Sequence, residues 1–292
     1  MRRALLSALI VTAVGSGCTS NEGVSSAPPA APTGGDMTRS VDVGGYSLWI
    51  TCRGEGSPTV VTEAGYDSSG QDVWSDLLGP LSEISRVCAY DRAGTGTSES
   101  RPKDGRITSA DQADELHRLL DGAGVAGPYV VLAHSYGGFI GRLFAAEYRD
   151  ETAGLILIDS SHEDEIGPYR RFYGNDPEGD WVDGGNAIDI DRTRRLLIDT
   201  ARAYGDLPLV AIQAAAYEDV LSEALWNRTQ GDLASLSDDG RHVQAGRGGH
   251  DVQDEDPQLI LTVVRAVVAA TRESEQLSPC DELVSGTDGV CP

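Results

Sequence analysis

The sequence predicts an α/β fold built on a mostly parallel β-sheet with helices on both faces. The first observation is alternation: short β-rich segments alternate with segments whose apolar residues have helical spacing. The second is that "VVL" at 130–132 and "LILI" at 155–158 are apolar throughout, which is typical of strands buried on both sides. The third is that 40% of the 292 residues are hydrophobic, enough for a sizeable core in one or two domains.

The expected elements follow one another from about residue 39, and two of them carry end signals. A helix is expected to begin at Thr108 or Ser109, either of which caps it, with Gly122 just past its last turn. The strand at 85–94 ends in an Asp and a glycine turn. The expected order is strand 47–51, strand 58–65, helix 73–84, strand 85–94, helix 108–124, strand 128–134, helix 137–150, strand 153–159, strand 207–213, a polar helical stretch, strand 241–246 and helix 257–273.

The stretch at 161–205 departs from this alternation. It is polar and aromatic before a short helix, and it is too long for an ordinary connection, which predicts a functional insertion or lid. Its aromatic residues either wall an apolar pocket or pack to hold the lid down. They are Tyr169, Phe172, Tyr173 and Trp181.

The N-terminus has the pattern of an export signal. Arg2 and Arg3 precede a short apolar run and then small residues, which predicts a signal peptide over 1–17. Cys18 follows "GSG" as in the lipobox of bacterial lipoproteins, although Gly15 stands where leucine is usual, so plain secretion stays open. Residues 18–38 read as a flexible tether and 39–292 as the folded domain. We expect a cell-surface protein whose contact with the membrane is a lipid anchor on Cys18.

Ser135 stands in "VVLAHSYGGFIGR", between an expected strand and an expected helix. In a parallel sheet, chemistry collects beyond the carboxyl ends of the strands, and small residues around a serine there let strand and helix approach closely. With Ala133 in place of the first glycine, this turn resembles the G-x-S-x-G elbow of the α/β-hydrolase family, and the resemblance extends over roughly 39–272. It implies an eight-stranded sheet, a lid insertion after the sixth strand, and a serine hydrolase that cleaves a carboxylic ester through an acyl-enzyme on Ser135 without cofactor or metal.

The resemblance also implies a general base after the last strand. His250 lies there, in a glycine-rich loop before the closing helix, and would take the Ser135 proton. His134 is next to the serine in sequence and is expected to point the other way. Structural roles are expected for four histidines: His117, His134, His162 and His242.

The acid partner has two candidate positions. The family order places it between the serine and the histidine. Asp159 follows an unbroken apolar strand, where a charge needs a partner such as an imidazole N–H, and we favour it. Glu218 and Asp219 follow the strand at 207–213, the usual family position, but without the usual Gly-x-x-Asp turn.

The oxyanion donors implied by the resemblance are two backbone amides. Tyr136, the residue after the serine, supplies one. Tyr66 supplies the other, in the stretch "VVTEAGYDSSG", where Gly65 suits close approach to a substrate oxygen. A wall of the acyl pocket is an equal alternative for Tyr66. The segment "YDRAGTGTSE" lacks a third glycine for dinucleotide binding and is a structural turn in this family.

Four cysteines besides Cys18 predict two disulfides in an exported chain. Of three connectivities, Cys280–Cys291 closes a short C-terminal loop. In the family's sheet the second and fourth strands are neighbours, so the resemblance implies Cys52–Cys88 as the other pair. No CxxC or histidine pair accompanies these thiols, so no metal is expected.

Composition and fold leave several activities open. With 46 Asp plus Glu against 23 Lys plus Arg, the chain is acidic, which argues against nucleic acid as a partner. A small-molecule ester is the partner that the resemblance implies. A peptidase or an acyltransferase of the same fold remains open. A non-catalytic binding module is the alternative from another class.

Overall fold

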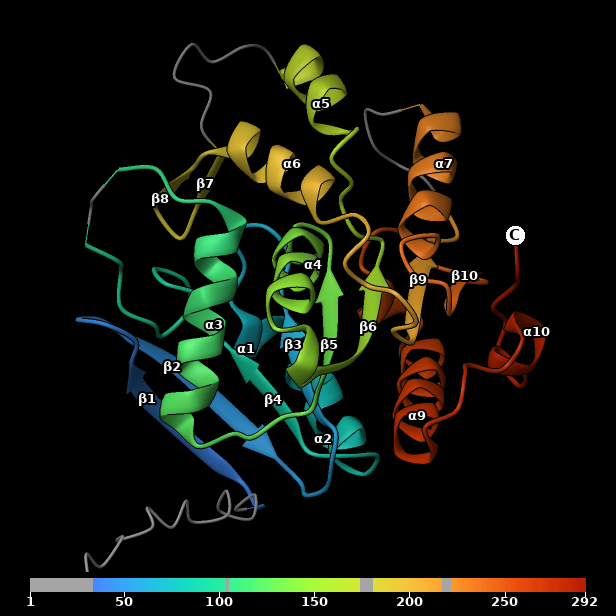
Figure 1. Ribbon diagram of the computed structural model, residues 1–292, viewed down its shortest axis with the longest axis horizontal. Helices are drawn as coiled ribbons and strands as arrows, with labels where there is room; N and C mark the ends of the chain where they lie inside the picture. Colours follow the sequence, from blue (N-terminus) through green and yellow to red (C-terminus); the bar gives the residue numbers. More distant parts are fainter. Residues whose placement is uncertain (1–33, 103–104, 174–180, 217–221) are drawn as a thin grey trace, which may run out of the picture. The chain divides into compact units, whose positions relative to one another are not determined.

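An eight-stranded sheet runs through the computed structural model, which describes residues 34–102, 105–173, 181–216 and 222–292 (Figure 1). Its strands are β1 (Met37–Asp42), β2 (Ser47–Arg53), β3 (Thr59–Glu63), β4 (Val87–Tyr90), β5 (Tyr129–His134), β6 (Thr152–Ile158), β9 (Leu209–Gln213) and β10 (Gly240–Gln244). They lie in the order β1-β2-β4-β3-β5-β6-β9-β10. Neighbours from β4 to β10 pair in parallel, while β2 pairs antiparallel with β1 and β4. The mostly parallel sheet that the sequence pattern predicts and the eight strands that the resemblance implies are both confirmed.

Helices follow most strands, as the alternating pattern predicts. They are α1 (Gly70–Val73), α2 (Ser75–Ser82), α3 (Ser109–Ala123), α4 (Gly137–Glu147), the 3-10 turn η1 (Arg149–Glu151), α5 (Ile166–Tyr173), α6 (Ile190–Asp199), α7 (Glu223–Ala234), α8 (Val252–Glu255), α9 (Pro257–Glu273) and α10 (Cys280–Leu283). Over the described ranges, none of them combines the length and apolarity that crossing a membrane requires.

The segment between β6 and β9 has its own elements. It contains α5, α6 and an antiparallel two-stranded hairpin formed by β7 (Trp181–Asp183) and β8 (Asn186–Ile188). We call residues 181–188 the insertion hairpin. The sequence predicted a long insertion at this place, but the hairpin has no alternating pattern long enough to predict it.

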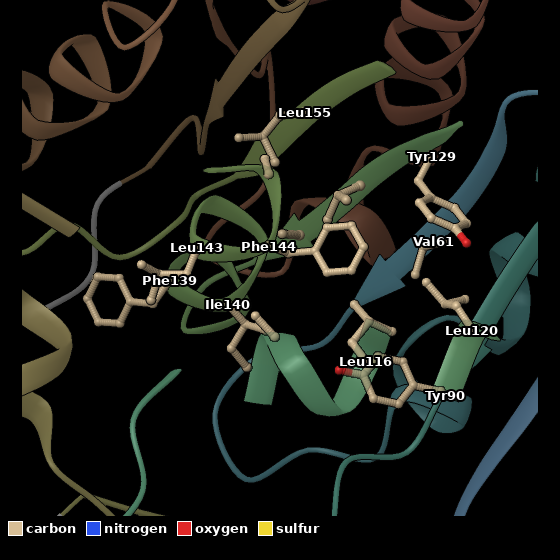
Figure 2. Close-up of a cluster of buried hydrophobic side chains, with 14 of the residues drawn as sticks. Val61, Tyr90, Leu116, Leu120, Tyr129, Phe139, Ile140, Leu143, Phe144 and Leu155 are labelled. Carbon is tan, nitrogen blue, oxygen red and sulfur yellow. The ribbon is translucent and has the colours of Figure 1, made fainter. Parts of the chain in front are cut away.

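The sheet is buried on both faces because adjacent side chains of its central strands enter two different cores. Val61 and Leu155 join a cluster with residues of α3 and α4, which Figure 2 shows. Val60 and Ile156, their neighbours in sequence, join a cluster with residues of α2 and α9. Side chains of a strand alternate between faces, so a strand covered on both faces must be apolar at every position. This accounts for the apolar runs in β5 and β6.

Two predicted boundaries differ from the structure. Helix α3 begins after Thr108, which forms a capping box with Asp111, but it ends at Gly124 in a left-handed conformation with φ 65°, not before Gly122. A Cβ on Gly122 would lie 2.8 Å from Cγ1 of Val41. This glycine therefore lies within α3 and lets the helix pack closely against β1. Strand β1 begins at Met37, before the expected start of the domain at 39. The predicted signal peptide (1–17), Cys18 and most of the predicted tether (18–38) lie outside the described residues.

Both predicted disulfides are present. Cys52 and Cys88 face each other across β2 and β4, with their Cα atoms 4.0 Å apart. The Cys280–Cys291 disulfide links α10 to the C-terminal segment. Two disulfides fit an exported protein, because reducing compartments do not preserve them.

The Cys52–Cys88 disulfide is expected to be the more stabilising of the two. It links residues 36 apart against 11 for the other, and cross-linking a longer loop removes more conformational entropy from the unfolded chain. The double variant Cys52→Ser/Cys88→Ser should lower the free energy of unfolding in urea by about 3–4 kcal/mol, against roughly 1 kcal/mol less for Cys280→Ser/Cys291→Ser. Native protein in which Cys52 and Cys88 both react with a thiol reagent would refute the pairing.

Candidate active site

Three of the predicted site residues lie at one edge of the sheet. Ser135 follows β5, Asp159 follows β6, and His250 lies in the loop between β10 and α8. β5 and β6 are parallel neighbours, and β9 and β10 run in the same direction beyond them. The carboxyl ends of these strands therefore meet at the same edge, where ligands bind in open α/β sheets.

The structure joins these three side chains by hydrogen bonds. His250 Nε2 lies 2.8 Å from Ser135 Oγ, and His250 Nδ1 lies 2.6 Å from Asp159 Oδ2. Asp159 is buried, whereas the His250 side chain is 54% exposed. The imidazole ring is therefore open to solvent and is held in place by its hydrogen bond to the buried carboxylate. The other acid candidates, Glu218 and Asp219, lie outside the described residues.

The turn that carries Ser135 is strained, as an elbow requires. Ser135 has φ 53°, in the left-handed region that side chains rarely adopt. The next two glycines permit the turn to pack: a Cβ on Gly137 would lie 2.5 Å from the Ala64 carbonyl oxygen, and one on Gly138 would lie 2.5 Å from Ser160 Cβ. The departure from the motif, Ala133, is fully buried in β5. The turn therefore forms with alanine at the first glycine position.

Asp159 is held on its second oxygen by two donors. Asp159 Oδ1 accepts hydrogen bonds from the Ala214 backbone N–H and the Trp226 indole N–H, both at 3.1 Å. Because both lone-pair regions have partners, the carboxylate has one orientation, with Oδ2 directed at His250. Trp226 is not predictable from the sequence, since nothing in the pattern of α7 indicates a contact with Asp159.

The two predicted oxyanion donors belong to segments that lie next to Ser135. Within the described parts of the chain, neither the Tyr136 nor the Tyr66 backbone N–H donates to a protein acceptor. The loop that carries Tyr66 lies against the serine, because a Cβ on Gly65 would be 3.5 Å from Ser135 Cβ. The Tyr136 ring is buried and its hydroxyl donates to Gln112 Oε1 at 2.7 Å, so its backbone is fixed from the interior.

Aromatic rings of the insertion lie beside these two tyrosines. The Trp181 ring lies 5.6 Å from the Tyr66 ring and 6.1 Å from the Tyr136 ring, centroid to centroid. Tyr169 of α5 contacts Trp181 edge-on at 6.4 Å. The side chains of Phe172 and Tyr173 lie outside the described residues. The insertion hairpin is thus packed onto the loop after β3.

The remaining histidines have partners of their own. His117 stacks on Tyr148 at 3.8 Å, and His242 Nε2 lies 2.9 Å from Gln213 Oε1. His134 lies closer to the site than expected: its Nε2 donates to the His250 backbone carbonyl at 2.9 Å, and the two rings are 4.7 Å apart. In the described ranges, no three His, Cys, Asp or Glu side chains are grouped so as to hold a metal ion.

His134 is expected to make stability depend on pH. Burial, with a further contribution from His250, lowers its pKa from 6.5 to about 4. His134 therefore binds a proton more tightly in the unfolded chain than in the folded one. Its contribution to the free energy of unfolding is complete above about pH 6.5 and is lost as the pH falls toward 4. Between pH 7 and pH 5, the free energy of unfolding of the wild type should fall by on the order of 1–2 kcal/mol more than that of His134→Gln. Equal decreases in urea titrations would refute this.

Comparisons with known proteins agree with this architecture. Residues 60–181 match the family model for the alpha/beta hydrolase fold. The uncharacterized protein YqjL of Bacillus subtilis is 26% identical over 250 residues, which cover 80% of this chain and 91% of that protein. A putative carbamate hydrolase, RutD of Yersinia enterocolitica, is 35% identical over 39% of this chain and 41% of that protein. Other curated relatives match this chain over only 18 to 22% of their own length.

Solved structures share the fold at low sequence identity. A putative lipase, lip1, of Acinetobacter baumannii has a TM-score of 0.61 at 17% identity, covering 82% of this chain and 93% of that one. A thermophilic esterase of Thermogutta terrifontis has a TM-score of 0.58 at 19% identity, covering 80% and 99%. The strand order and these likenesses show that the chain has the α/β-hydrolase fold, and together with the family-model match they support its place in the α/β-hydrolase fold family.

Proposed function

We propose that this protein is an exported serine hydrolase that cleaves a carboxylic ester through an acyl-enzyme on Ser135. The observation that carries the proposal is the continuous chain of hydrogen bonds from Asp159 through His250 to Ser135, with distances of 2.6 and 2.8 Å. A serine alone is a weak nucleophile, and an adjacent imidazole oriented by a carboxylate is the arrangement that activates it. The family and the relatives named above support hydrolase activity in general.

Acylation is the first proposed step, and it involves Ser135, His250 and the two predicted oxyanion donors. His250 Nε2 accepts the Ser135 proton while Oγ forms a bond to the ester carbonyl carbon. The negative charge that develops on the carbonyl oxygen is stabilised by the Tyr136 and Tyr66 backbone N–H groups. The tetrahedral intermediate then releases the alcohol, whose oxygen receives the proton from His250, and Ser135 remains acylated.

Deacylation is the second proposed step, in which a water molecule replaces the serine hydroxyl as the nucleophile. His250 removes a proton from a water molecule, which attacks the acyl carbon, and the proton is returned to Ser135 Oγ as the carboxylic acid leaves. Asp159 neither forms a covalent bond nor passes on a proton in either step. Its role is to hold the imidazole with Nδ1 protonated and to stabilise the positive charge that forms on the ring.

Export and anchoring remain part of the proposal. The two disulfides support an oxidising compartment. A lipid on Cys18 would tether the domain to the membrane surface, and the predicted tether at 18–38 would supply the reach.

The test of the proposed function is a substrate panel on the purified domain. p-Nitrophenyl esters of graded acyl length should be hydrolysed, and a fluorophosphonate probe should label the protein. Hydrolysis of aminoacyl p-nitroanilides without ester turnover would instead favour a peptidase, and acyl transfer to an added alcohol in preference to water would favour an acyltransferase. A folded protein that neither turns over esters nor reacts with the probe would favour a binding module.

A further inference from the structure

A buried arginine lies directly behind the loop that carries Tyr66. Arg92, in the turn after β4, is 3% exposed, although nothing in the proposed mechanism uses it. We call residues 64–69 the oxyanion loop. Arg92 Nη2 donates to the Gly65 carbonyl at 2.6 Å, and Nη1 donates to the Ala64 carbonyl at 2.8 Å. The guanidinium therefore holds two successive peptide groups of this loop.

The bond to Gly65 fixes the direction of the predicted oxyanion donor. The Gly65–Tyr66 peptide is trans, since the cis bonds lie elsewhere, before Pro58 and Pro128. In a planar trans peptide, the C=O and the following N–H point in opposite directions. With the Gly65 carbonyl held by Arg92, the Tyr66 N–H must point away from the guanidinium. A charged donor on the carbonyl also polarises the peptide and makes its N–H a stronger donor.

Arg92 also contacts the other predicted donor residue. Its guanidinium carbon lies 5.7 Å from the centroid of the Tyr136 ring, within range of a cation–π contact. One buried charge thus touches both segments from which the oxyanion donors come.

The insertion hairpin holds Arg92 in place through Asp183. Asp183 is fully buried, and its two oxygens accept hydrogen bonds from Arg92 Nε at 2.8 Å and Nη2 at 2.7 Å. The same carboxylate accepts from the Asp67 backbone N–H at 2.8 Å, inside the oxyanion loop. In return, Asp67 Oδ1 accepts from the Gly184 backbone N–H at 2.9 Å. The hairpin, the arginine and the loop form one connected unit.

Arg92 and Asp183 form a buried ion pair inside this unit. Although burial acts to raise it, the charge and hydrogen bonds of Arg92 lower the pKa of Asp183, so the carboxylate stays ionised. Burial raises the pKa of Glu63, which also contacts Arg92. A buried ion pair is weak evidence for a stabilising role, because apolar residues of similar volume often serve as well. Its clearest consequence here is a single position for the loop.

We propose that Arg92 and Asp183 are positioning residues for the oxyanion site, so that the insertion hairpin sets the orientation of the Tyr66 N–H. This inference rests on the proposed function, because it concerns the transition state of the reaction at Ser135. On this proposal, the oxyanion site forms when the insertion hairpin packs onto the oxyanion loop. Arg92 and Asp183 are both buried and act only through the oxyanion loop.

The test compares Arg92→Lys and Asp183→Asn with a matched control, Arg142→Lys. Arg142 is also buried and paired with a carboxylate, that of Glu163, and it has no hydrogen bond to the oxyanion loop. Losing one oxyanion donor costs about 100- to 1,000-fold in kcat, so displacing one in Arg92→Lys should cost about 10- to 100-fold, with KM changed less than about threefold. Asp183→Asn should cost about tenfold by the same argument. Arg142→Lys should stay near the wild type.

A second readout separates positioning from general loss of structure. A trifluoromethyl ketone forms an oxyanion at the serine, so its affinity should fall by the same factor as kcat/KM in both site variants. Equal kcat values in Arg92→Lys and Arg142→Lys would overturn the proposal. Should Arg92→Lys fail to fold, Asp183→Asn decides, because it keeps the arginine, and wild-type kcat in this folded variant would overturn the proposal.

Failure of the proposed function has a different signature. Wild-type protein without ester turnover or probe labelling contradicts the hydrolase itself. Amide hydrogen exchange in residues 64–69 then decides the coupling alone: faster exchange in Asp183→Asn supports it, and exchange equal to that of the wild type overturns it.

Discussion

Ser135→Ala is expected to lower kcat/KM for a p-nitrophenyl ester by about 10⁴-fold or more. The variant removes the oxygen that His250 Nε2 contacts at 2.8 Å, so no acyl-enzyme can form. The remaining activity would come from substrate binding and the oxyanion donors alone. Steady-state kinetics with the best ester of the panel measures the effect, and thermal unfolding checks that the fold is retained.

Ser75→Ala is the matched control for this substitution. Ser75 is an exposed serine in α2, and its hydroxyl donates to the Asp72 carbonyl at 3.0 Å, so it has no part in the proposed reaction. Its kcat/KM should equal that of the wild type within about twofold, as for most surface changes. A Ser135→Ala protein that retains more than a tenth of the wild-type activity would show that another group is the nucleophile.

Asp159→Asn is expected to lower kcat by about 10³- to 10⁴-fold while leaving the fold intact. An asparagine has nearly the same shape, but its oxygen is needed by the Ala214 and Trp226 N–H groups, so it presents an amide N–H to His250 Nδ1. Without the carboxylate the imidazole is held in the wrong tautomer, and the positive charge that forms on it is no longer stabilised. Because the lost interaction belongs to the transition state, KM should change much less than kcat.

Glu218→Gln and Asp219→Asn are the controls that separate the two acid candidates. Both should retain kcat within about threefold of the wild type if Asp159 is the acid. A large loss of kcat in either of them, with near-normal activity in Asp159→Asn, would transfer the acid role to the loop after β9.

The serine and the histidine are predictable from sequence because their positions depend on local structure. An apolar strand, small residues and a helix in succession specify a tight turn at Ser135. This pattern is local and does not depend on contacts with distant parts of the chain. His250 follows the same logic, since it stands between the last strand and the closing helix. The fold is predictable for a related reason: strands buried on both faces must be apolar throughout, and this signal is visible in a single sequence.

The contacts that support these residues are not predictable in this way. Trp226 approaches Asp159 from a helix 67 positions away, and Asp183 approaches Arg92 across 91 positions. Neither pair produces a periodic pattern or a motif, because each depends on how separate elements pack on the sheet. The end of α3 was misplaced for a similar reason, since the packing of Gly122 against Val41 is a tertiary contact.

The most direct test of the whole account is to locate a covalent adduct by mass spectrometry after reaction with a fluorophosphonate. Trypsin should release residues 119–142 as one peptide, which contains a single serine, Ser135. In the wild type, this peptide should gain the mass of the phosphonyl group at Ser135, and it should stay unmodified when His250 is replaced by alanine. Native protein in which this peptide remains unmodified, or in which the adduct lies on another residue, would contradict it.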